Sequence, residues 1–191
     1  MNKDDLNAVW RQVERAFMDE RINSERALQA VVYCALTSTL SSECLVLVEP
    51  GFPSNQEIAG YVPDLLALNR VKRLVDCFFE IKCAPHFWFT EGDIKRDLDK
   101  LQAYSSLVGS TIEVDVFGPN RVLDANGAWI GGRPQYRMAQ STLVAFVVLA
   151  RKNKMVSRKE LSHPIASQAN FVFLSGCTEP GAEEFSVQWR E

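Results

Sequence analysis

The stretch that decides the fold reads Val62-Pro63-Asp64-Leu65-Leu66-Ala67-Leu68, then Asn69-Arg70-Val71-Lys72-Arg73, then Leu74-Val75-Asp76-Cys77-Phe78-Phe79-Glu80-Ile81-Lys82. The two outer parts are dense in Val, Leu, Ile and Phe, which favours strands, and the polar middle part favours a turn. Side chains alternate along a strand, so we expect one face to carry Asp76, Phe78, Glu80 and Lys82, and the other Val75, Cys77, Phe79, Ile81 and Cys83. The sequence therefore predicts a hairpin with one apolar face and one ionisable face.

The length of the turn decides whether Asp64 joins the ionisable face. Residues that oppose each other in an antiparallel pair point to the same face. A loop of odd length centred on Val71 opposes Asp64 to Phe78 and leaves it one diagonal step from Glu80. A two-residue turn would oppose Asp64 to an odd-numbered residue and separate the two carboxylates. We therefore predict an odd loop or a bulge.

Two carboxylates and a lysine on one sheet face have two explanations. The face could be the solvated outside of an antiparallel sheet that carries an ordinary cross-strand ion pair. However, Leu66, Leu68 and Phe78 are expected on the same face, which would partly bury the carboxylates. A hard divalent cation such as Mg²⁺ would then offset their repulsion, and a neighbouring ammonium could orient or help deprotonate a metal-bound water.

These residues resemble the motif of the PD-(D/E)xK nucleases, whose fold is also called restriction-endonuclease-like. Pro63-Asp64 is followed, sixteen positions after Asp64, by Glu80-Ile81-Lys82, with a hairpin between the two apolar strands. The family has a helix with an acidic residue, three meandering strands, a helix and a further strand, and residues 22–117 offer each part in that order. The Gln-x-x-x-Tyr signature of the RecB-like branch is not met, because Gln102-Ala103-Tyr104 has a different spacing.

The resemblance implies metal-dependent hydrolysis of phosphodiester bonds, with DNA as the favoured substrate. By the same resemblance, Asp64, Glu80 and the carbonyl of Ile81 would bind Mg²⁺ or Mn²⁺, and Lys82 would position or activate the attacking water. Glu25 matches the acidic residue of the family's first helix and would support Lys82 or a second metal. Its place in the first turn of a helix is equally explained by a favourable interaction with the helix N-terminus.

Two other functions remain open. A nuclease-like fold could have lost cleavage and serve as a subunit that binds nucleic acid or protein, because a fold does not guarantee an activity. The chain could also be an ordinary α/β interaction protein in which the Glu-x-Lys tripeptide is accidental.

The distribution of charge bears on a nucleic-acid partner. A net charge of −3 argues against indiscriminate binding to nucleic acid. A local basic rim around an acidic site would satisfy both facts, although each basic residue could be an ordinary solvated charge and His86 an ordinary loop histidine. The candidate nucleic-acid contacts are Arg70, Lys72, Arg73, Lys95, Lys100 and His86.

Periodicity and turn signals predict the remaining elements. We expect helices over 4–20, from an Asn23 or Ser24 cap to 40, from a Thr90 or Asp93 cap to 107, and over 136–151. We expect further strands over 43–49, 111–117 and 170–174, a turn-rich segment over 118–134, and a frayed acidic tail from 176.

Length and composition bound the architecture. With 191 residues and 47% hydrophobic content the chain can bury a full core, so we predict one domain with a nuclease-like core over 22–117. The helix over 4–20 precedes this core, and a helix and strand extension over 118–191 follows it. The predicted class is α/β, with a mixed, mainly antiparallel central sheet flanked by helices and restriction-endonuclease-like by resemblance.

The sequence also favours a cytoplasmic protein with no membrane partner. Its N-terminus opens an amphipathic pattern rather than a signal peptide, and its longest apolar run, 143–150, is far shorter than the roughly 20 residues that cross a bilayer. The five cysteines lack a Cys-x-x-Cys pair, which argues for free thiols in a reducing compartment. A homodimer, or a place in a larger assembly, is compatible with the sequence.

Overall fold

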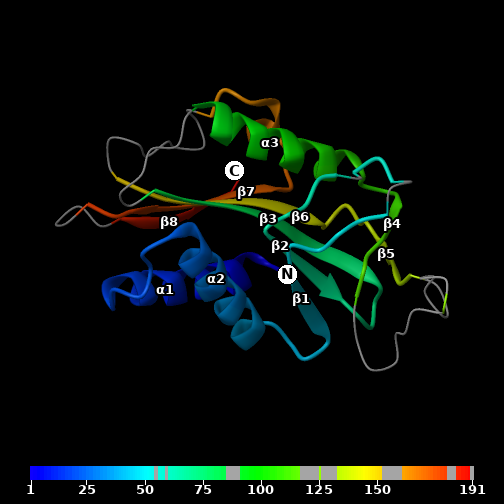
Figure 1. Ribbon diagram of the computed structural model, residues 1–191, viewed down its shortest axis with the longest axis horizontal. Coiled ribbons are helices and arrows are strands. Elements are labelled where there is room, and N and C mark those ends of the chain that lie inside the picture. The colour runs from blue at the N-terminus through cyan, green and yellow to red at the C-terminus, as the bar shows by residue number, and fades with distance from the viewer. Residues whose placement is uncertain are drawn as a thin grey trace.

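A mixed β-sheet with helices on both faces forms the protein (Figure 1). The computed structural model describes residues 1–53, 56–58, 60–84, 91–116, 125, 133–151, 161–179 and 184–189. Within these ranges the helices are α1 (Lys3–Met18), α2 (Glu25–Thr39), α3 (Glu91–Ser106) and the short 3₁₀ helix η3 (Pro164–Ser167). The strands are β1 (Cys44–Val48), β2 (Leu65–Asn69), β3 (Leu74–Ala84), β4 (Thr111–Glu113), β5 (Gln135–Arg137), β6 (Leu143–Ala150), β7 (Phe171–Cys177) and β8 (Phe185–Gln188).

The main path of the sheet runs β1-β2-β3-β6-β7-β8. The pairs β1–β2, β2–β3 and β7–β8 are antiparallel, whereas β6 runs parallel to both β3 and β7. The short strands β4 and β5 lie off this path and pair antiparallel with each other. The predicted α/β class, with a mixed and mainly antiparallel sheet flanked by helices, is therefore confirmed. None of the described helices is both long and apolar enough to cross a membrane.

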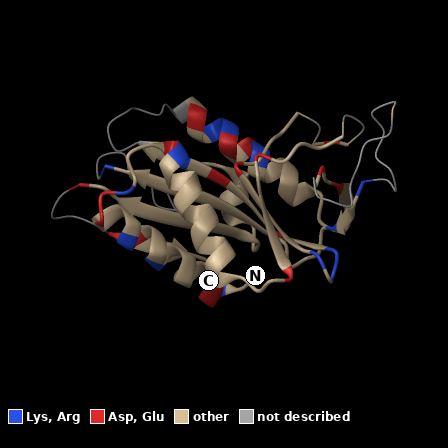
Figure 2. Cartoon of the chain, turned by 60° about the horizontal axis from the view of Figure 1, so that its bottom comes forward, with Lys and Arg blue, Asp and Glu red and all other residues tan. Residues whose placement is uncertain are grey.

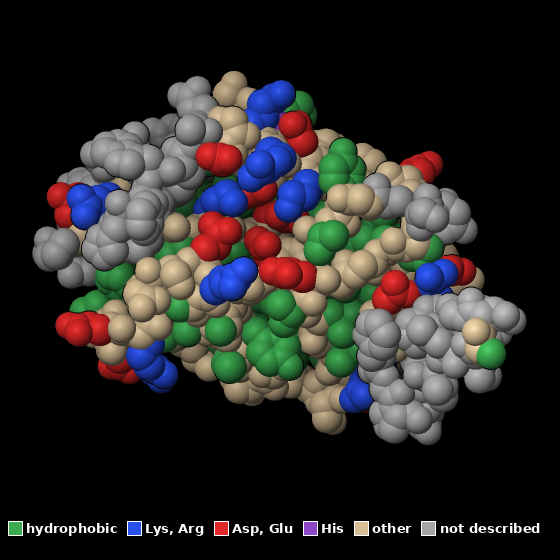
Figure 3. All heavy atoms as spheres, viewed as in Figure 1, with side chains coloured by type: hydrophobic (Ala, Val, Ile, Leu, Met, Phe, Trp, Pro, Cys, Tyr) green, Lys and Arg blue, Asp and Glu red, His purple; other side chains and the backbone are tan. Residues whose placement is uncertain are grey.

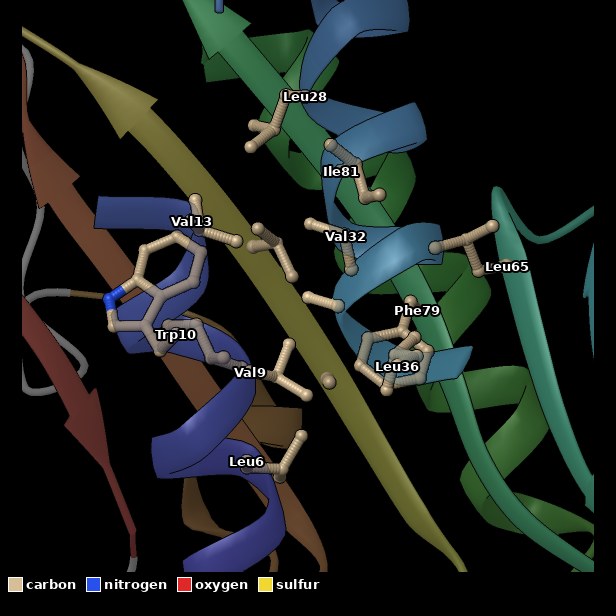
Figure 4. Packing of buried hydrophobic residues seen from close by; sticks show 14 of the residues in the cluster. Leu6, Val9, Trp10, Val13, Leu28, Val32, Leu36, Leu65, Phe79 and Ile81 are labelled. Carbon is tan, nitrogen blue, oxygen red and sulfur yellow. The ribbon is translucent and has the colours of Figure 1, made fainter. Parts of the chain in front are cut away.

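Helices α1 and α2 cover one face of the sheet. Asn2 and Asp5 form a capping box at the start of α1, and Ser24 caps α2 by accepting a hydrogen bond from the backbone N–H of Ala27. Figure 4 shows apolar side chains of both helices converging on the sheet. The labelled residues are Leu6, Val9, Trp10 and Val13 from α1, Leu28, Val32 and Leu36 from α2, and Leu65, Phe79 and Ile81 from the sheet.

Helix α3 covers the opposite face. Its buried residues Leu98, Leu101 and Tyr104 pack with Phe78 and Phe146 of the sheet. Residues 78, 80 and 82 of β3 share a face because side chains alternate, so Glu80 and Lys82 lie on the α3 side. This arrangement places the ionisable face of the hairpin under a helix and not in solvent.

A β-bulge in the hairpin brings Asp64 and Glu80 to the same face. The turn spans 70–73, an even number of residues, and Asn69 pairs with Leu74. The register then shifts between Ala67 and Leu68, so that Leu65 pairs with Phe79 and Asp64 comes to lie opposite Glu80. The predicted bulge is confirmed, although Asp64 faces Glu80 and not Phe78.

The bulge also corrects the predicted face of Asp76. Its carboxylate contacts the N-terminal amine of Met1 at 3.5 Å and the thiol of Cys44 at 3.6 Å. Met1 packs on the α1–α2 side, whereas Val75 joins the α3 side with Phe78. Regular alternation predicted that Asp76 shares a face with Phe78 and that Val75 lies on the other face. The extra residue of the bulge reverses the faces of Asp76 and Val75.

The expected helix over 136–151 is wrong. The segment instead forms β5 and β6, and every residue of β6 is buried. A short, continuous apolar run fits a buried strand as well as a buried helix, so periodicity alone does not distinguish them. The strand β6 is buried because β3 and β7 flank it and both sheet faces are covered by helices.

Two further expectations change with the topology. Of the strand predicted over 111–117, the structure has β4 at Thr111–Glu113, which pairs with β5, and the neighbour of β3 is β6. The tail from 176 was expected to fray, but β7 continues to Cys177 and β8 pairs with it. Most of the segment 118–134 lies outside the described residues.

Candidate functional site

Six ionisable side chains meet where β3 runs beyond its pairing with β2. We call them the charged cluster, and they are Glu25 of α2, Asp64 before β2, Glu80 and Lys82 of β3, and Asp97 and Lys100 of α3. Figure 2 shows the alternating acidic and basic positions of α3 beside the sheet, and Figure 3 shows charged side chains gathered across the middle of one face. The three motif residues of the sequence and Glu25 therefore come together.

Two of the carboxylates satisfy backbone groups of β3. Because β2 begins opposite Phe79, the next N–H groups on that edge of β3 have no strand partner. Asp64 Oδ2 accepts a hydrogen bond from Ile81 N at 2.5 Å, and Glu25 Oε2 accepts one from Cys83 N at 3.3 Å. Both carboxylates thus close a sheet edge, which is a structural role that requires no ligand.

Glu80 is the most buried member of the cluster, with 1% of its surface exposed. One carboxylate oxygen, Oε2, accepts a hydrogen bond from Lys100 Nζ, while Oε1 has no hydrogen-bond partner among the described residues. Burial, reinforced by the neighbouring Asp64 and opposed by Lys100, raises the pKa of Glu80 to about 8. A buried carboxylate with an unpartnered oxygen is costly, and a cation at Oε1 would offset that cost.

Lys82 carries a proton at neutral pH. Burial by itself lowers its pKa, but Asp97, with Glu25 and Asp64, more than offsets this effect, so that the pKa of Lys82 is raised. Its Nζ lies 3.0 Å from Asp97 Oδ2 and 3.7 Å from Glu25 Oε2. An ammonium group can donate hydrogen bonds to a water or an anionic oxygen, but it cannot take up a proton.

Burial also raises the pKa of Asp64, to about 6, against the opposing effects of its hydrogen bond from Ile81 and of Lys100. Asp64 therefore titrates closer to neutrality than an exposed aspartate.

Helix α3 contributes two residues whose part in the site the motif did not reveal. Asp97 is buried, and Lys100 Nζ lies 3.8 Å from Asp97 Oδ1 and 3.4 Å from the carbonyl oxygen of Val62. Lys100 was a candidate phosphate contact, whereas it binds Glu80. The available sequence signal was the spacing of 97, 100 and 104 beside the apolar stripe of the helix.

The charge of the cluster suits a divalent cation. Four carboxylates and two ammonium groups leave a net charge of −2 when all are ionised. Asp64, Glu80 and the carbonyl of Ile81 supply the oxygen donors that Mg²⁺ and Mn²⁺ accept. Within the described ranges, however, no group of three or more His, Cys, Asp and Glu side chains is arranged to hold a metal ion. In addition, the Lys100 ammonium contacts one oxygen of Glu80.

The other predicted contacts are not brought to the cluster. Arg70, Lys72 and Arg73 lie at the hairpin tip, and Lys82 is nine residue steps beyond Arg73 along the extended strand, roughly 30 Å. Lys95 is exposed on α3 and pairs with Asp99 at 3.9 Å. His86 lies outside the described residues.

Comparison of the chain with protein-family models, with curated proteins and with solved structures found no match. The chemistry of the charged cluster and the order of the elements around it are therefore the basis for a functional proposal.

Proposed function

We propose that the charged cluster is the active site of a divalent-cation-dependent nuclease that hydrolyses phosphodiester bonds in DNA. The observation that carries the proposal is the convergence of Asp64, which directly precedes β2, with Glu80 and Lys82 of β3. They lie in one partly buried cluster with an unpartnered carboxylate oxygen. An ordinary solvated sheet face would expose these groups, and here Glu80 is buried beneath α3.

The order of the elements supports a restriction-endonuclease-like fold. Helix α2 carries Glu25, the meander β1-β2-β3 carries Asp64, Glu80 and Lys82, and α3 leads to β6, which lies parallel to β3. This is the order that the resemblance to PD-(D/E)xK nucleases implies, with β6 in place of the strand expected over 111–117.

Each residue then has a role that its surroundings support. Asp64, Glu80 and the Ile81 carbonyl would hold Mg²⁺ or Mn²⁺, which when bound would polarise the scissile phosphate. The Lys82 ammonium would donate hydrogen bonds to a phosphate oxygen or to the attacking water, and so would orient the reacting groups without removing a proton. Asp97 and Glu25 are positioning residues, because they hold Lys82 charged and in place.

The contacts within the cluster favour a second candidate. Ile81 N binds Asp64, Cys83 N binds Glu25 and Lys100 binds Glu80, so each of these three carboxylates has a hydrogen-bond partner without a metal. A nuclease-like domain that no longer cuts, and that binds nucleic acid or protein as a subunit, would have these contacts permanently.

Calorimetric titration of Mn²⁺, beside a nicking assay on supercoiled plasmid DNA, distinguishes the two. Asp64→Asn keeps an oxygen that can accept the Ile81 N hydrogen bond and removes the charge, so the fold should persist. We expect this variant to lose Mn²⁺ affinity by at least about tenfold, which is roughly 1.4 kcal/mol. We expect Lys82→Ala to abolish nicking.

Two matched variants control for charge alone. Asp76→Asn removes a carboxylate of β3 that lies outside the cluster, and Lys3→Ala removes an exposed lysine at the start of α1. Both should behave as the wild type. Nicking at the wild-type rate by Asp64→Asn or Lys82→Ala would contradict the nuclease assignment. Absence of Mn²⁺ binding by the wild type would favour the subunit that no longer cuts.

A further inference from the structure

An exposed apolar pair borders the charged cluster. Tyr61 and Val62 are 40% and 42% exposed, and they immediately precede Pro63-Asp64. The other large hydrophobic residues that the structure describes as exposed are Met18, Val48 and Val71. None of these three lies within two positions of a residue of the charged cluster in the sequence. In Figure 3 hydrophobic side chains adjoin the charged band on the same face. Tyr61 and Val62 thus present apolar surface to solvent beside the proposed site.

A turn at Gly60 and two hydrogen bonds position the backbone of this pair. Gly60 adopts a positive φ of 90°, which turns the chain, and Tyr61 N donates a hydrogen bond to the carbonyl of Ile58 at 2.9 Å. Lys100 of the cluster donates to the carbonyl oxygen of Val62 at 3.4 Å. The position of Tyr61 is therefore tied to the residue that binds Glu80.

Aromatic packing fixes the orientation of the Tyr61 ring. It meets Tyr104 edge to face, with 6.4 Å between ring centroids and 88° between planes, and Tyr104 in turn stacks on Phe78 at 4.4 Å. Tyr104 is fully buried and adjoins the cluster, since burial together with Glu80 and Asp64 raises its pKa. The buried Tyr104 ring therefore contacts Tyr61 on the side of the cluster, while 40% of the Tyr61 residue stays exposed to solvent.

We propose that Tyr61 is a stacking platform for a nucleobase next to the scissile phosphate, and that the protein prefers DNA with unpaired bases over intact duplex. The inference rests on the proposed function in one respect, namely that the ligand is DNA. Bases inside a duplex are already stacked on both faces, so a base must be unpaired to lie on Tyr61. Stacking is also a contribution that does not depend on charge, and an acidic cluster does not by itself attract phosphate.

Fluorescence anisotropy with a short, labelled oligonucleotide of mixed sequence tests the proposal. The single strand and its duplex are compared in EDTA and again with Ca²⁺. We expect the wild type to bind the single strand more tightly, and Tyr61→Ala to weaken that binding by about five- to a hundred-fold with duplex binding unchanged. Tyr61→Phe keeps the ring and should keep the affinity.

Two controls separate stacking from other effects. Val71→Ala removes an exposed apolar side chain at the hairpin tip and should bind as the wild type does. Tyr61→Leu keeps an apolar side chain without a π face and should resemble Tyr61→Ala. The melting temperature of each variant shows whether it is folded.

Several outcomes overturn the inference. The first is wild-type protein that binds duplex more tightly than single strands, or does not bind single strands. The second is a Tyr61→Ala variant with the affinity of the wild type. The third is full affinity of Tyr61→Leu, which would indicate an apolar contact suited to a protein partner. Failure of the proposed function gives a different pattern. If single strands bind through Tyr61 but the plasmid is not nicked and Asp64→Asn binds Mn²⁺ normally, the stacking platform stands and the catalytic assignment falls.

Discussion

Glu80 is the residue at which stability and the proposed function oppose each other. A hydrophobic side chain at this buried position would pack against Phe146 and the α3 side chains without a desolvation cost. The glutamate instead leaves one oxygen without a hydrogen bond and depends on Lys100 for the other. Departures of this kind from local packing rules are expected where a residue is retained for binding or chemistry.

The raised pKa of Glu80 predicts how stability changes with pH. Its pKa is about 8 in the folded protein and near 4.5 in an unfolded chain, so the native state binds the proton more tightly. The contribution of protonated Glu80 to the stability of the fold is fully present below pH 4.5, and it is lost as the pH rises through about 8. Over that range we expect Glu80 to lower the free energy of unfolding by up to about 1.4 kcal/mol per pH unit.

Urea denaturation at several pH values measures that slope. Glu80→Gln cannot ionise, so its free energy of unfolding should fall less steeply than that of the wild type between pH 5 and 8. Glu14→Gln, which removes an exposed carboxylate from α1, controls for the loss of one negative charge. Equal slopes for Glu80→Gln and the wild type would show that Glu80 ionises without cost.

A second prediction concerns Lys100 and its effect on Mn²⁺ affinity, and it rests on the proposed metal site. Lys100→Met keeps most of the side-chain stem and removes the ammonium that occupies Glu80. We expect Mn²⁺ affinity to rise about tenfold or more, since a hydrogen bond to a charged group contributes roughly 1.5–3 kcal/mol. Without Mn²⁺ the variant should melt at a lower temperature than the wild type, and saturating Mn²⁺ should reverse the loss.

Lys95→Met is the matched control for Lys100→Met. It removes a lysine from the same helix, but one that is 73% exposed and remote from Glu80. If both variants bind Mn²⁺ equally, Lys100 does not compete with the ion.

Among the elements, the β2–β3 hairpin determines the composition of the site. The even turn at 70–73 would by itself oppose Asp64 to Phe79 and turn it away from Glu80. The bulge at Asp76 corrects the parity, so one unpaired residue decides whether the two carboxylates share a face. From the sequence we predicted an odd loop or a bulge, because only these place both carboxylates on one face. The sequence did not identify Asp76 as the extra residue.

Deletion of Asp76 tests the bulge. Val75 and Cys77 already face opposite sides, so the deletion joins them in regular alternation and keeps Asp64 opposite Glu80. We expect a folded variant that loses about 2 kcal/mol or less, mainly from the contacts with Met1 and Cys44. Thermal melting and Mn²⁺ titration measure the two effects.

Deletion of Ile81 is the comparison within the same strand. It removes a buried side chain and turns Lys82 to the opposite face, so we expect a loss above about 4 kcal/mol or no folded protein. Equal stability of the two deletions would contradict the role given to the bulge.

At the scale of the whole molecule, the C-terminal strand ties α1 to the sheet. Phe185 of β8 packs against Trp10 and Phe17 of α1, each at 5.7 Å between ring centroids. Trp10 Nε1 also donates a hydrogen bond to the carbonyl of Ser175 in β7. The first helix and the last strand therefore stabilise each other, although a frayed tail was expected.

Gly176 lies under the ring of Phe185, and a substitution there tests how firmly the packing of β8 holds that ring. A Cβ at position 176 would approach Leu149 Cδ2 and two ring carbons of Phe185 within 3 Å. We expect Gly176→Ala to lower the free energy of unfolding by about 1–3 kcal/mol through overpacking. Urea denaturation of Gly176→Ala, Phe185→Ala and the double variant gives the coupling.

The double variant should lose less stability than the sum of the single variants, because removal of the ring makes room for the added methyl group. Additive losses would mean that Phe185 does not confine position 176.

The sequence by itself determined the elements whose signals are local. The amphipathic stripe of α1, the Ser24 cap of α2, the alternating apolar arms of the hairpin and the spacing of Asp64, Glu80 and Lys82 all follow from neighbours a few positions apart. The class of fold followed from the same signals.

Only the tertiary structure decided which segments become neighbours. The apolar run 143–150 is a strand because β3 and β7 pair with it, and β8 is ordered because α1 covers Phe185. Asp97 and Lys100 join the site because α3 packs over Glu80 and Lys82. In each case the free energy comes from burial and pairing between residues that are distant in sequence, which no local pattern contains.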